Sequence, residues 1–195
     1  MEKDLKNSLE VLRRGGTILY PTDTIWGIGC VATSQVAVKN LLRIKERDND
    51  KGLLVLIDDP EKLSVYVAEI PDIAWELVAV AEDPLTIVYP GGINLPVNVL
   101  HNDGSVGIRV TIDDFCRKLI HRFGKPVIST SANLSGESFP AVFPEISDEI
   151  KSRVDYVVKW RQDDLTRKNP SPIIKLGLKG DIEIIRPGIP GLKRK

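Results

Sequence analysis

Apolar and polar positions along the chain follow a helical period in some segments and an extended period in others. Three leucines recur at helical spacing within residues 5–12, and the glycine pair at 15–16 ends the first predicted helix. Thr33 or Ser34 can cap a second helix, whose apolar stripe continues to Ile44. Residues 53–57 form a continuous apolar run, which is typical of a buried strand.

The same patterns predict the remaining elements. Further helices are expected at about 60–68, 72–81, 113–123 and 143–151. Strands are expected at about 17–20, 85–89, 106–111, 126–130, 154–160, 172–177 and 182–186. Some neighbouring strands are joined by helices and others by short turns, such as the one at 178–181. We therefore predict one α/β domain over residues 1–195, built on a twisted open mixed parallel/antiparallel sheet with flanking helices.

The charge balance gives no indication of a protein that binds nucleic acid or membranes through its overall charge. A chain of 195 residues is long enough to bury one full core, and its 27 basic and 27 acidic residues give a formal net charge of zero. No overall field therefore draws the chain to nucleic acid or to a membrane surface. Any site for an anion must be local.

Cysteine usage and the N-terminal segment narrow the picture further. With two widely separated cysteines and two histidines, the sequence encodes neither a disulfide framework nor a Cys/His zinc site. Residues 1–16 are charged and amphipathic, and they lack the apolar run of a signal peptide or membrane anchor. We expect a soluble, cytoplasmic protein that has no membrane partner.

Three polar segments remain once the apolar core is set aside. The first, "YPTDTIWGIG" at 20–29, taken alone is a turn after a strand, and its spaced glycines are weak evidence for a dinucleotide site. The second, "KERDNDK" at 45–51, taken alone is better explained as a solvated charged turn. The third places Arg109 inside an apolar strand, so its guanidinium must reach the surface or meet an anion, either a ligand or a carboxylate such as Asp23.

Taken together, these cations and the hydroxyls that follow the strand at 126–130 suit a ligand with phosphates and a carboxylate. The sequence contains no G-x-x-x-x-G-K-[ST] phosphate loop, no G-x-S-x-G nucleophile turn and no metal-ligand cluster. Many positioning groups without a nucleophile indicate catalysis that holds two substrates in line and stabilises the charge that develops.

Five segments, in their order and spacing, resemble the motifs of a known family. They are "GGTILYPTDTIWGIGC", "IKERDNDKGLLVLI", "SVGIRV", "GKPVISTSANLSG" and "IIRPG", and together they span nearly the whole chain. The chain resembles the YrdC-like threonylcarbamoyl-AMP synthases in their short, single-domain form. The most diagnostic elements are K-x-R at Lys45 and Arg47 and S-x-N at Ser131 and Asn133.

The resemblance implies a fold, a reaction and a partner. The sheet would surround a large, concave, positively charged cavity. The reaction would condense L-threonine, bicarbonate or carbon dioxide, and ATP into threonylcarbamoyl-adenylate and pyrophosphate, with Mg²⁺ on the phosphates. A downstream tRNA threonylcarbamoyl transferase would then pass the group to an adenosine beside the anticodon.

The resemblance also assigns roles by position. The threonine-binding positions are Thr24, Arg109, Ser131 and Ser171. The ATP-binding positions are Lys45, Arg47, Lys51, Ser105, Asn133 and Arg186. The catalytic set is Lys45, Arg47, Ser131 and Asn133, and no residue is assigned to a metal. Because side chains two apart on an extended segment point to the same side, we expect Ser131 and Asn133 to touch the amino acid and the nucleotide together.

Several positions depart from the family's pattern. Asp48 replaces a proline, Pro172 a threonine, and Ala141 a threonine or serine. The segment "AEDPLT" at 81–86 stands where W-P-G-P-L-T is usual, and Trp26 stands where tyrosine is common. We interpret Trp26 as wall packing rather than a base-stacking platform. The departures concern the ATP contacts, that of Lys51 above all.

Two other functions stay open at this point. One is an RNA-binding module that uses the basic cavity, which zero net charge and the lack of exposed aromatic clusters make less favourable. The other is the related carbamoyl-transfer domain of the hydrogenase-maturation type. That domain belongs to much longer proteins with zinc-finger cysteines, which this chain lacks.

Overall fold

The computed structural model describes residues 1–47 and 52–188, so the positions of Asp48 and Lys51 lie outside the described residues. The helices are α1 Glu2–Arg13, α2 Gln35–Ile44, α3 Leu63–Tyr66, α4 Asp72–Val80, α5 Asp114–Phe123 and α6 Asp148–Arg153, with 3-10 turns at Pro60–Lys62 and Phe143–Glu145. The strands are β1 Ile18–Tyr20, β2 Gly27–Gly29, β3 Leu54–Ile57, β4 Thr86–Tyr89, β5 Val106–Val110, β6 Val127–Ser131, β7 Tyr156–Val157, β8 Ile173–Leu176 and β9 Ile182–Arg186.

All of these strands join one open sheet in the order β7-β1-β2-β6-β3-β5-β4-β8-β9. The pairs β1–β7, β3–β5 and β4–β8 are parallel, and the other neighbours are antiparallel. The predicted fold class, an α/β fold with a mixed open sheet, is therefore confirmed.

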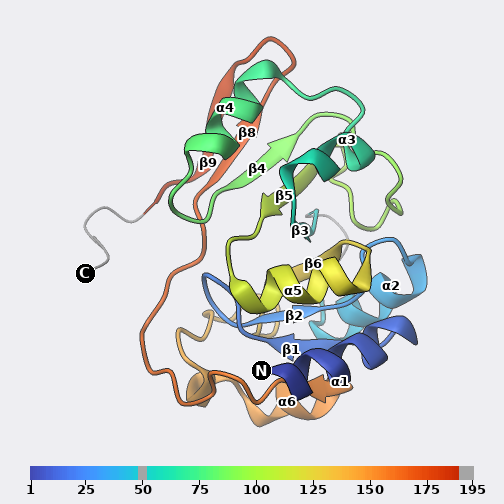
Figure 1. Ribbon diagram of the computed structural model, residues 1–195, viewed down its shortest axis with the longest axis vertical. Coiled ribbons are helices and arrows are strands. Elements are labelled where there is room, and N and C mark those ends of the chain that lie inside the picture. Colours follow the sequence, from blue (N-terminus) through green and yellow to red (C-terminus); the bar gives the residue numbers. More distant parts are fainter. Residues whose placement is uncertain (48–51, 189–195) are drawn as a thin grey trace.

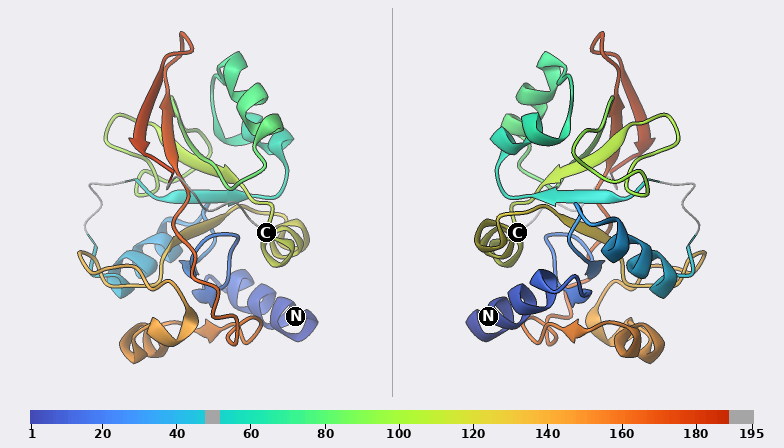
Figure 2. Two further views of the ribbon diagram at one scale, coloured as in Figure 1. Left: turned by 90° about the vertical axis from the view of Figure 1, so that its left-hand side faces the viewer. Right: turned by 90° about the vertical axis from the view of Figure 1, so that its right-hand side faces the viewer.

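The helices cover the sheet unequally. Figures 1 and 2 show α1, α5, α3 and α4 on one side of the molecule and α2 and α6 on the other, next to the half of the sheet that holds β1 and β2. The segment between β7 and β8 runs along the outside of the molecule and joins the two halves of the sheet (Figure 1). The face of β4, β5 and β8 that lies opposite α3 and α4 carries no helix in these views.

Local signals explain where several helices begin and end. Ser34, rather than Thr33, caps α2, because its hydroxyl accepts a hydrogen bond from the Ala37 amide at 3.3 Å. Asp113 caps α5 in the same way, and Gly124 ends that helix with a left-handed φ of 71°.

Three elements differ from the sequence prediction. Strand β2 was expected as a turn, and it pairs with both β1 and β6. The helix expected at 143–151 is divided, because Ile146 and Ser147 are extended and Ser147 caps α6 instead. The strand expected at 154–160 is reduced to β7, which pairs with β1 alone among the described strands.

Within the described residues, no helix is both long and apolar enough to cross a membrane.

Candidate functional site

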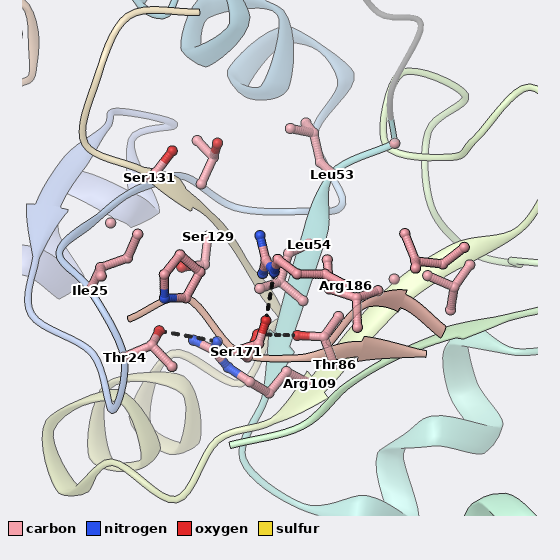
Figure 3. Close-up of a pocket in the computed structure, with 18 of the residues that line it drawn as sticks. Thr24, Ile25, Leu53, Leu54, Thr86, Arg109, Ser129, Ser131, Ser171 and Arg186 are labelled. Carbon is pink, nitrogen blue, oxygen red and sulfur yellow. Dashed lines mark hydrogen bonds between the residues drawn. The ribbon is translucent and has the colours of Figure 1, made fainter. Parts of the chain in front are cut away.

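A cavity of about 500 Å³ lies on the face of the sheet opposite α3 and α4 (Figure 3). The alternation of side chains along the strands creates one wall of it. Along β5 and the residue before it, Ser105, Gly107 and Arg109 line the cavity, whereas Ile108 and Val110 face the apolar side beneath α4. The arginine in an apolar strand is therefore explained, because its strand has one apolar face and one face that lines a polar cavity.

The opposite wall comes from the other half of the sheet. The loop before β2 contributes Thr24 and Trp26, and β6 contributes Ser129 and Ser131. Trp26 is only 6% exposed, and its ring packs against that of Phe143 at a centroid distance of 4.8 Å. A ring that is buried and already packs against another ring fits the interpretation of Trp26 as wall packing.

The cavity is electropositive. Its described lining includes the side chains of Arg47, His101, Arg109, Lys175 and Arg186 and contains no aspartate or glutamate. Arginines and a lysine outnumber acidic residues on this wall, which favours an anionic ligand, and two of them are also paired with carboxylates behind it, Arg109 with Asp23 and Lys175 with Asp103. The described part of the chain also holds no group of three or more His, Cys, Asp or Glu side chains that fits a metal ion.

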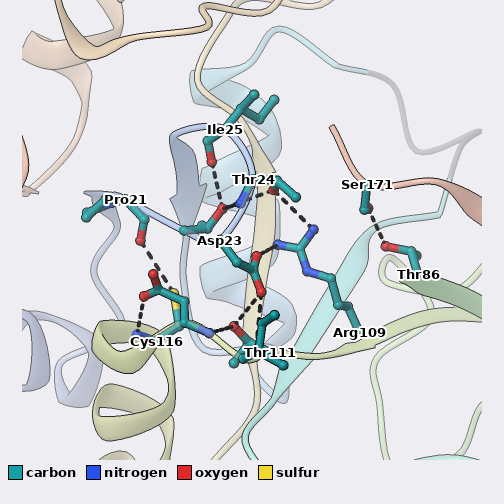
Figure 4. A network of polar contacts seen from close by, with 12 residues as sticks. Pro21, Asp23, Thr24, Ile25, Thr86, Arg109, Thr111, Cys116 and Ser171 are labelled. Atoms are coloured by element: carbon teal, nitrogen blue, oxygen red, sulfur yellow. Dashed lines mark hydrogen bonds and ion pairs between the residues drawn. The ribbon is translucent and has the colours of Figure 1, made fainter. Parts of the chain in front are cut away.

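Arg109 is the centre of a buried polar network (Figure 4). It is 2% exposed, its Nη2 lies 3.1 Å from Asp23 Oδ1, and its Nη1 donates to Thr24 Oγ1 at 3.2 Å. Asp23 Oδ2 accepts from the Thr111 hydroxyl and from the Ile112 amide. The second alternative for this arginine, a carboxylate of the protein, is thus observed, and the guanidinium still borders the cavity.

Two hydroxyls and a second arginine stand beside this network. The hydroxyls of Ser171 and Thr86 lie 2.7 Å apart, and both side chains are buried. Arg186 Nε donates to the Ser171 carbonyl at 2.8 Å, which directs its guanidinium over the cavity (Figure 3). Burial and the charge of Arg109 lower the pKa of Arg186.

The remaining cations lie nearer the start of β3 and β5. Arg47 Nη2 donates to the Gly52 carbonyl at 3.1 Å, and burial lowers the pKa of this guanidinium. Ser105 donates its hydroxyl to Asp103 at 2.6 Å, and Lys175 forms an ion pair with the same carboxylate at 2.6 Å. These hydrogen bonds hold the pKa of Asp103 well below its usual range.

The structure brings most of the predicted site residues together. Those that line the cavity are Thr24, Arg47, Ser105, Arg109, Ser131, Ser171 and Arg186. Lys45 and Asn133 are not among its lining residues, and Lys51 lies outside the described residues.

The expected geometry of Ser131 and Asn133 is wrong. Strand β6 ends at Ser131, and the chain bends there, because the Asn133 amide donates back to the Ser131 carbonyl at 3.0 Å. The Asn133 side-chain amide donates to the carbonyls of Leu134 and Glu137, and its buried Oδ1 has no hydrogen-bond partner among the described residues. The two side chains therefore do not share one extended face.

Sequence reasoning assigned no role to five polar lining residues: Thr86, His101, Ser129, Thr130 and Lys175. For Ser129 a signal was present, since it lies two positions before Ser131 on the same strand. Thr86, His101 and Lys175 reach the cavity only because the fold brings segments that are distant in sequence together. No local sequence pattern predicts their position.

Known proteins match this chain in sequence. The family model for Sua5, YciO and YrdC, described as "Telomere recombination", matches residues 10–188. A threonylcarbamoyl-AMP synthase of Pseudoalteromonas translucida is 34% identical over 154 residues, which are 77% of this chain and 82% of the relative. One of Vibrio cholerae is 33% identical over 174 residues, which are 88% of this chain and 92% of the relative.

Solved structures match the fold. P. abyssi Sua5 complexed with L-threonine gives a TM-score of 0.79 at 25% identity, over 88% of this chain and 50% of that one, so the chain spans about half the length of that protein. E. coli YciO gives 0.82 at 24% identity over 99% and 93%. T. kodakarensis HypF gives 0.77 at 20% identity over 93% and 24%. The last two show the fold alone.

Proposed function

The chain belongs to the Sua5/YciO/YrdC family, and from that premise we propose that it is a threonylcarbamoyl-AMP synthase. The observation that carries the proposal is one cavity in which a buried arginine and several hydroxyls face a set of further cations, with no carboxylate on its described wall. An amino acid with a carboxylate and a triphosphate both fit such a wall.

The reaction needs no nucleophile from the protein. The amine nitrogen of L-threonine adds to carbon dioxide, which bicarbonate supplies, and loses a proton to form a carbamate. One carbamate oxygen then forms a bond to the α-phosphorus of ATP, and the bond to the leaving pyrophosphate breaks. The contribution of the chain is to hold both substrates in line and to neutralise the charge on the phosphates.

We assign the threonine end of the cavity to Thr24, Arg109 and Ser171. Their side chains gather at one place in Figure 3, where Arg109 already donates to Thr24. A guanidinium has five N–H donors, so Arg109 keeps donors for a carboxylate after it has engaged Asp23 and Thr24. Ser131, on the opposite wall, would hydrogen-bond the same substrate.

We assign the nucleotide end to Arg47, Ser105 and Arg186. The two arginines supply forks for phosphate oxygens. The Ser105 hydroxyl has one hydrogen-bond donor, and it uses this donor for Asp103. Towards a ligand, the same hydroxyl therefore acts as an acceptor. Mg²⁺ would arrive on the phosphates of ATP, and the tRNA threonylcarbamoyl transferase would consume the product.

Mass spectrometry of the reaction product tests this function. The protein is incubated with ATP, Mg²⁺, L-threonine and ¹³C-bicarbonate, and in controls each substrate is left out. We expect labelled threonylcarbamoyl-adenylate and pyrophosphate in equal amounts, and neither when threonine is omitted. Nucleotide turnover that is independent of threonine, or release of ADP and phosphate, contradicts the proposal. Turnover with carbamoyl phosphate would favour the carbamoyl-transfer alternative instead.

A further inference from the structure

Lys45 is the one cation of the K-x-R element that the structure places behind the cavity wall. It is 3% exposed, and its ammonium donates to two main-chain carbonyls, those of Ser131 at 2.5 Å and Asn133 at 2.6 Å. In return the carbonyl of Lys45 accepts from the Ser135 amide at 2.9 Å. Three hydrogen bonds therefore join this residue to the segment 131–135.

The end of α2 explains why Lys45 and Arg47 point to different places. Glu46 has a left-handed φ of 51°, the Glu46 amide donates to the Arg43 carbonyl, and the Arg47 amide donates to the Leu42 carbonyl. This is the hydrogen-bond pattern of a Schellman motif, which reverses the chain direction after the last helical turn. Lys45 consequently lies on the buried side of the helix end, whereas Arg47 reaches the cavity.

Few other contacts hold the segment 131–135. Ser131, the last residue of β6, lines the cavity, and beyond it the described strands continue with one main-chain hydrogen bond, from the Ala132 amide to the Trp26 carbonyl at 3.2 Å. Without the ammonium, the Ser131 carbonyl would keep the Asn133 amide as a donor, whereas the Asn133 carbonyl would keep no donor among the described residues. A buried carbonyl without a donor is strongly unfavourable, and a charged donor satisfies it best. Burial, and then the positive charge of Arg47, lower the pKa of Lys45.

We propose that Lys45 is a positioning residue, whose ammonium fixes the segment 131–135 so that Ser131 faces the cavity, and not a ligand of the ATP phosphates. That Lys45 is not a ligand of ATP rests on the proposed function. That its ammonium fixes the segment 131–135 does not.

Hydrogen exchange and calorimetry on Lys45→Met test both halves. Methionine keeps the length of the side chain and removes the donors. In the ligand-free variant, we expect amides of residues 131–137 to exchange roughly tenfold faster or more, the factor for losing one charge-assisted hydrogen bond. We also expect the affinities for threonine and for ATP to fall together, each by roughly tenfold.

Two arginine variants complete the comparison. Arg47→Ala should weaken ATP binding by roughly tenfold or more and leave exchange in 131–137 and threonine affinity unchanged. Arg43→Ala, on the exposed side of α2 and outside the cavity lining, should change none of these quantities. If Lys45→Met loses ATP affinity while exchange in 131–137 and threonine affinity stay at the wild-type value, Lys45 is a phosphate ligand and the inference is wrong.

A measurement on the unaltered protein covers the case in which Lys45→Met does not fold. With ¹⁵N-labelled lysine, the ammonium of Lys45 should be protected from solvent exchange without ATP, and its NMR signal should stay in place when ATP is added. A rapidly exchanging ammonium that shifts on ATP addition overturns the proposal. Because protection is measured without ligand, its failure is distinguishable from a failure of the proposed function.

Discussion

At the scale of single residues, Arg109 and Asp23 form a buried ion pair that also borders the cavity. The two side chains are 2% and 3% exposed, and their closest charged atoms lie 3.1 Å apart. Breaking a buried pair leaves one charge without compensation, which costs several kcal/mol, whereas a different cation in the same place keeps the pair. This difference separates the structural role of Arg109 from its proposed role in binding.

Arg109→Lys is expected to lower threonine affinity about tenfold or more, because an ammonium does not reproduce the two-pronged contact of a guanidinium with a carboxylate. Its stability should fall much less than that of Asp23→Asn, which leaves Arg109 uncompensated and should lose about 3 kcal/mol or more. Calorimetry with threonine and with threoninol, which lacks the carboxylate, together with thermal unfolding, measures both effects. Lost stability with unchanged threonine affinity in Arg109→Lys rejects the carboxylate clamp.

The titration of Lys45 predicts how stability depends on pH. Burial, and then the charge of Arg47, lower the pKa of this ammonium from 10.5 to about 8, against a smaller opposing effect of Glu137. Between these two pKa values the unfolded chain binds more protons than the folded one, so the free energy of unfolding rises with pH across that window. Below pH 8 Lys45 is protonated in both the folded and the unfolded chain, so its contribution to the free energy of unfolding no longer changes with pH.

Urea unfolding of wild type and Lys45→Met from pH 7 to 11 measures this contribution. We expect the stability of wild type relative to the variant to rise by about 3 kcal/mol or slightly more across the window, since one pK unit is worth about 1.4 kcal/mol. The difference between the two proteins removes the titration of all other lysines and tyrosines. A difference that is flat with pH, or that falls, shows that the folded protein does not depress the pKa of Lys45.

At the scale of elements, the sequence pattern predicts those whose period is strong and local. Helices α1, α2, α4 and α5 and most strands lie where apolar spacing and capping residues place them. Strand β2 escapes such reasoning, since two of its three residues are glycines and glycine disfavours strands. Its glycines are required by close approach: a β-carbon on Gly29 would lie 2.4 Å from the Ile128 carbonyl oxygen.

Gly29→Ala is therefore expected to destabilise the protein by about 2–4 kcal/mol, because the strand backbone and Tyr20 must move to admit a methyl group. The matched control is Gly107→Ala, also within a strand, whose added β-carbon would meet its nearest neighbour at 3.8 Å. That variant should stay within about 1 kcal/mol of wild type. Equal unfolding midpoints for the two variants in urea would contradict this account of β2.

The sequence predicted which residues form the candidate site better than it predicted how their side chains are arranged. The family resemblance selected Arg47, Arg109 and Ser171, which do line the cavity. The bend after Ser131 was not predictable, because it depends on an ammonium that lies 86 positions earlier in the chain. Two residues at the right spacing share a face only where the strand continues, and tertiary contacts decide where it ends.

At the scale of the whole molecule, the cavity draws its walls from both halves of one sheet. Thr24 and Ser131 belong to the half with β1, β2 and β6, whereas Arg109, Ser171 and Arg186 belong to β5, β8, β9 and their flanks. A ligand that contacts both walls binds the folded chain and not the unfolded one. Folding and binding are therefore linked, and the overall charge of zero leaves the local cations to select the ligand.

Thermal unfolding with combinations of ligands tests this organisation. A ligand at about 100 times its dissociation constant stabilises the folded state by about 2.7 kcal/mol, so threonine and Mg-ATP should each raise the unfolding midpoint and together raise it further. Transfer RNA at the same phosphate concentration should leave the midpoint unchanged at about 0.15 M salt, because a chain without net positive charge gains little from counterion release. Arg109→Lys, with threonine affinity about tenfold lower, should show about half of the wild-type threonine shift or less and keep the ATP shift. Stabilisation by RNA that disappears steeply as salt is raised, without any shift from threonine, would instead identify the cavity as an RNA-binding surface.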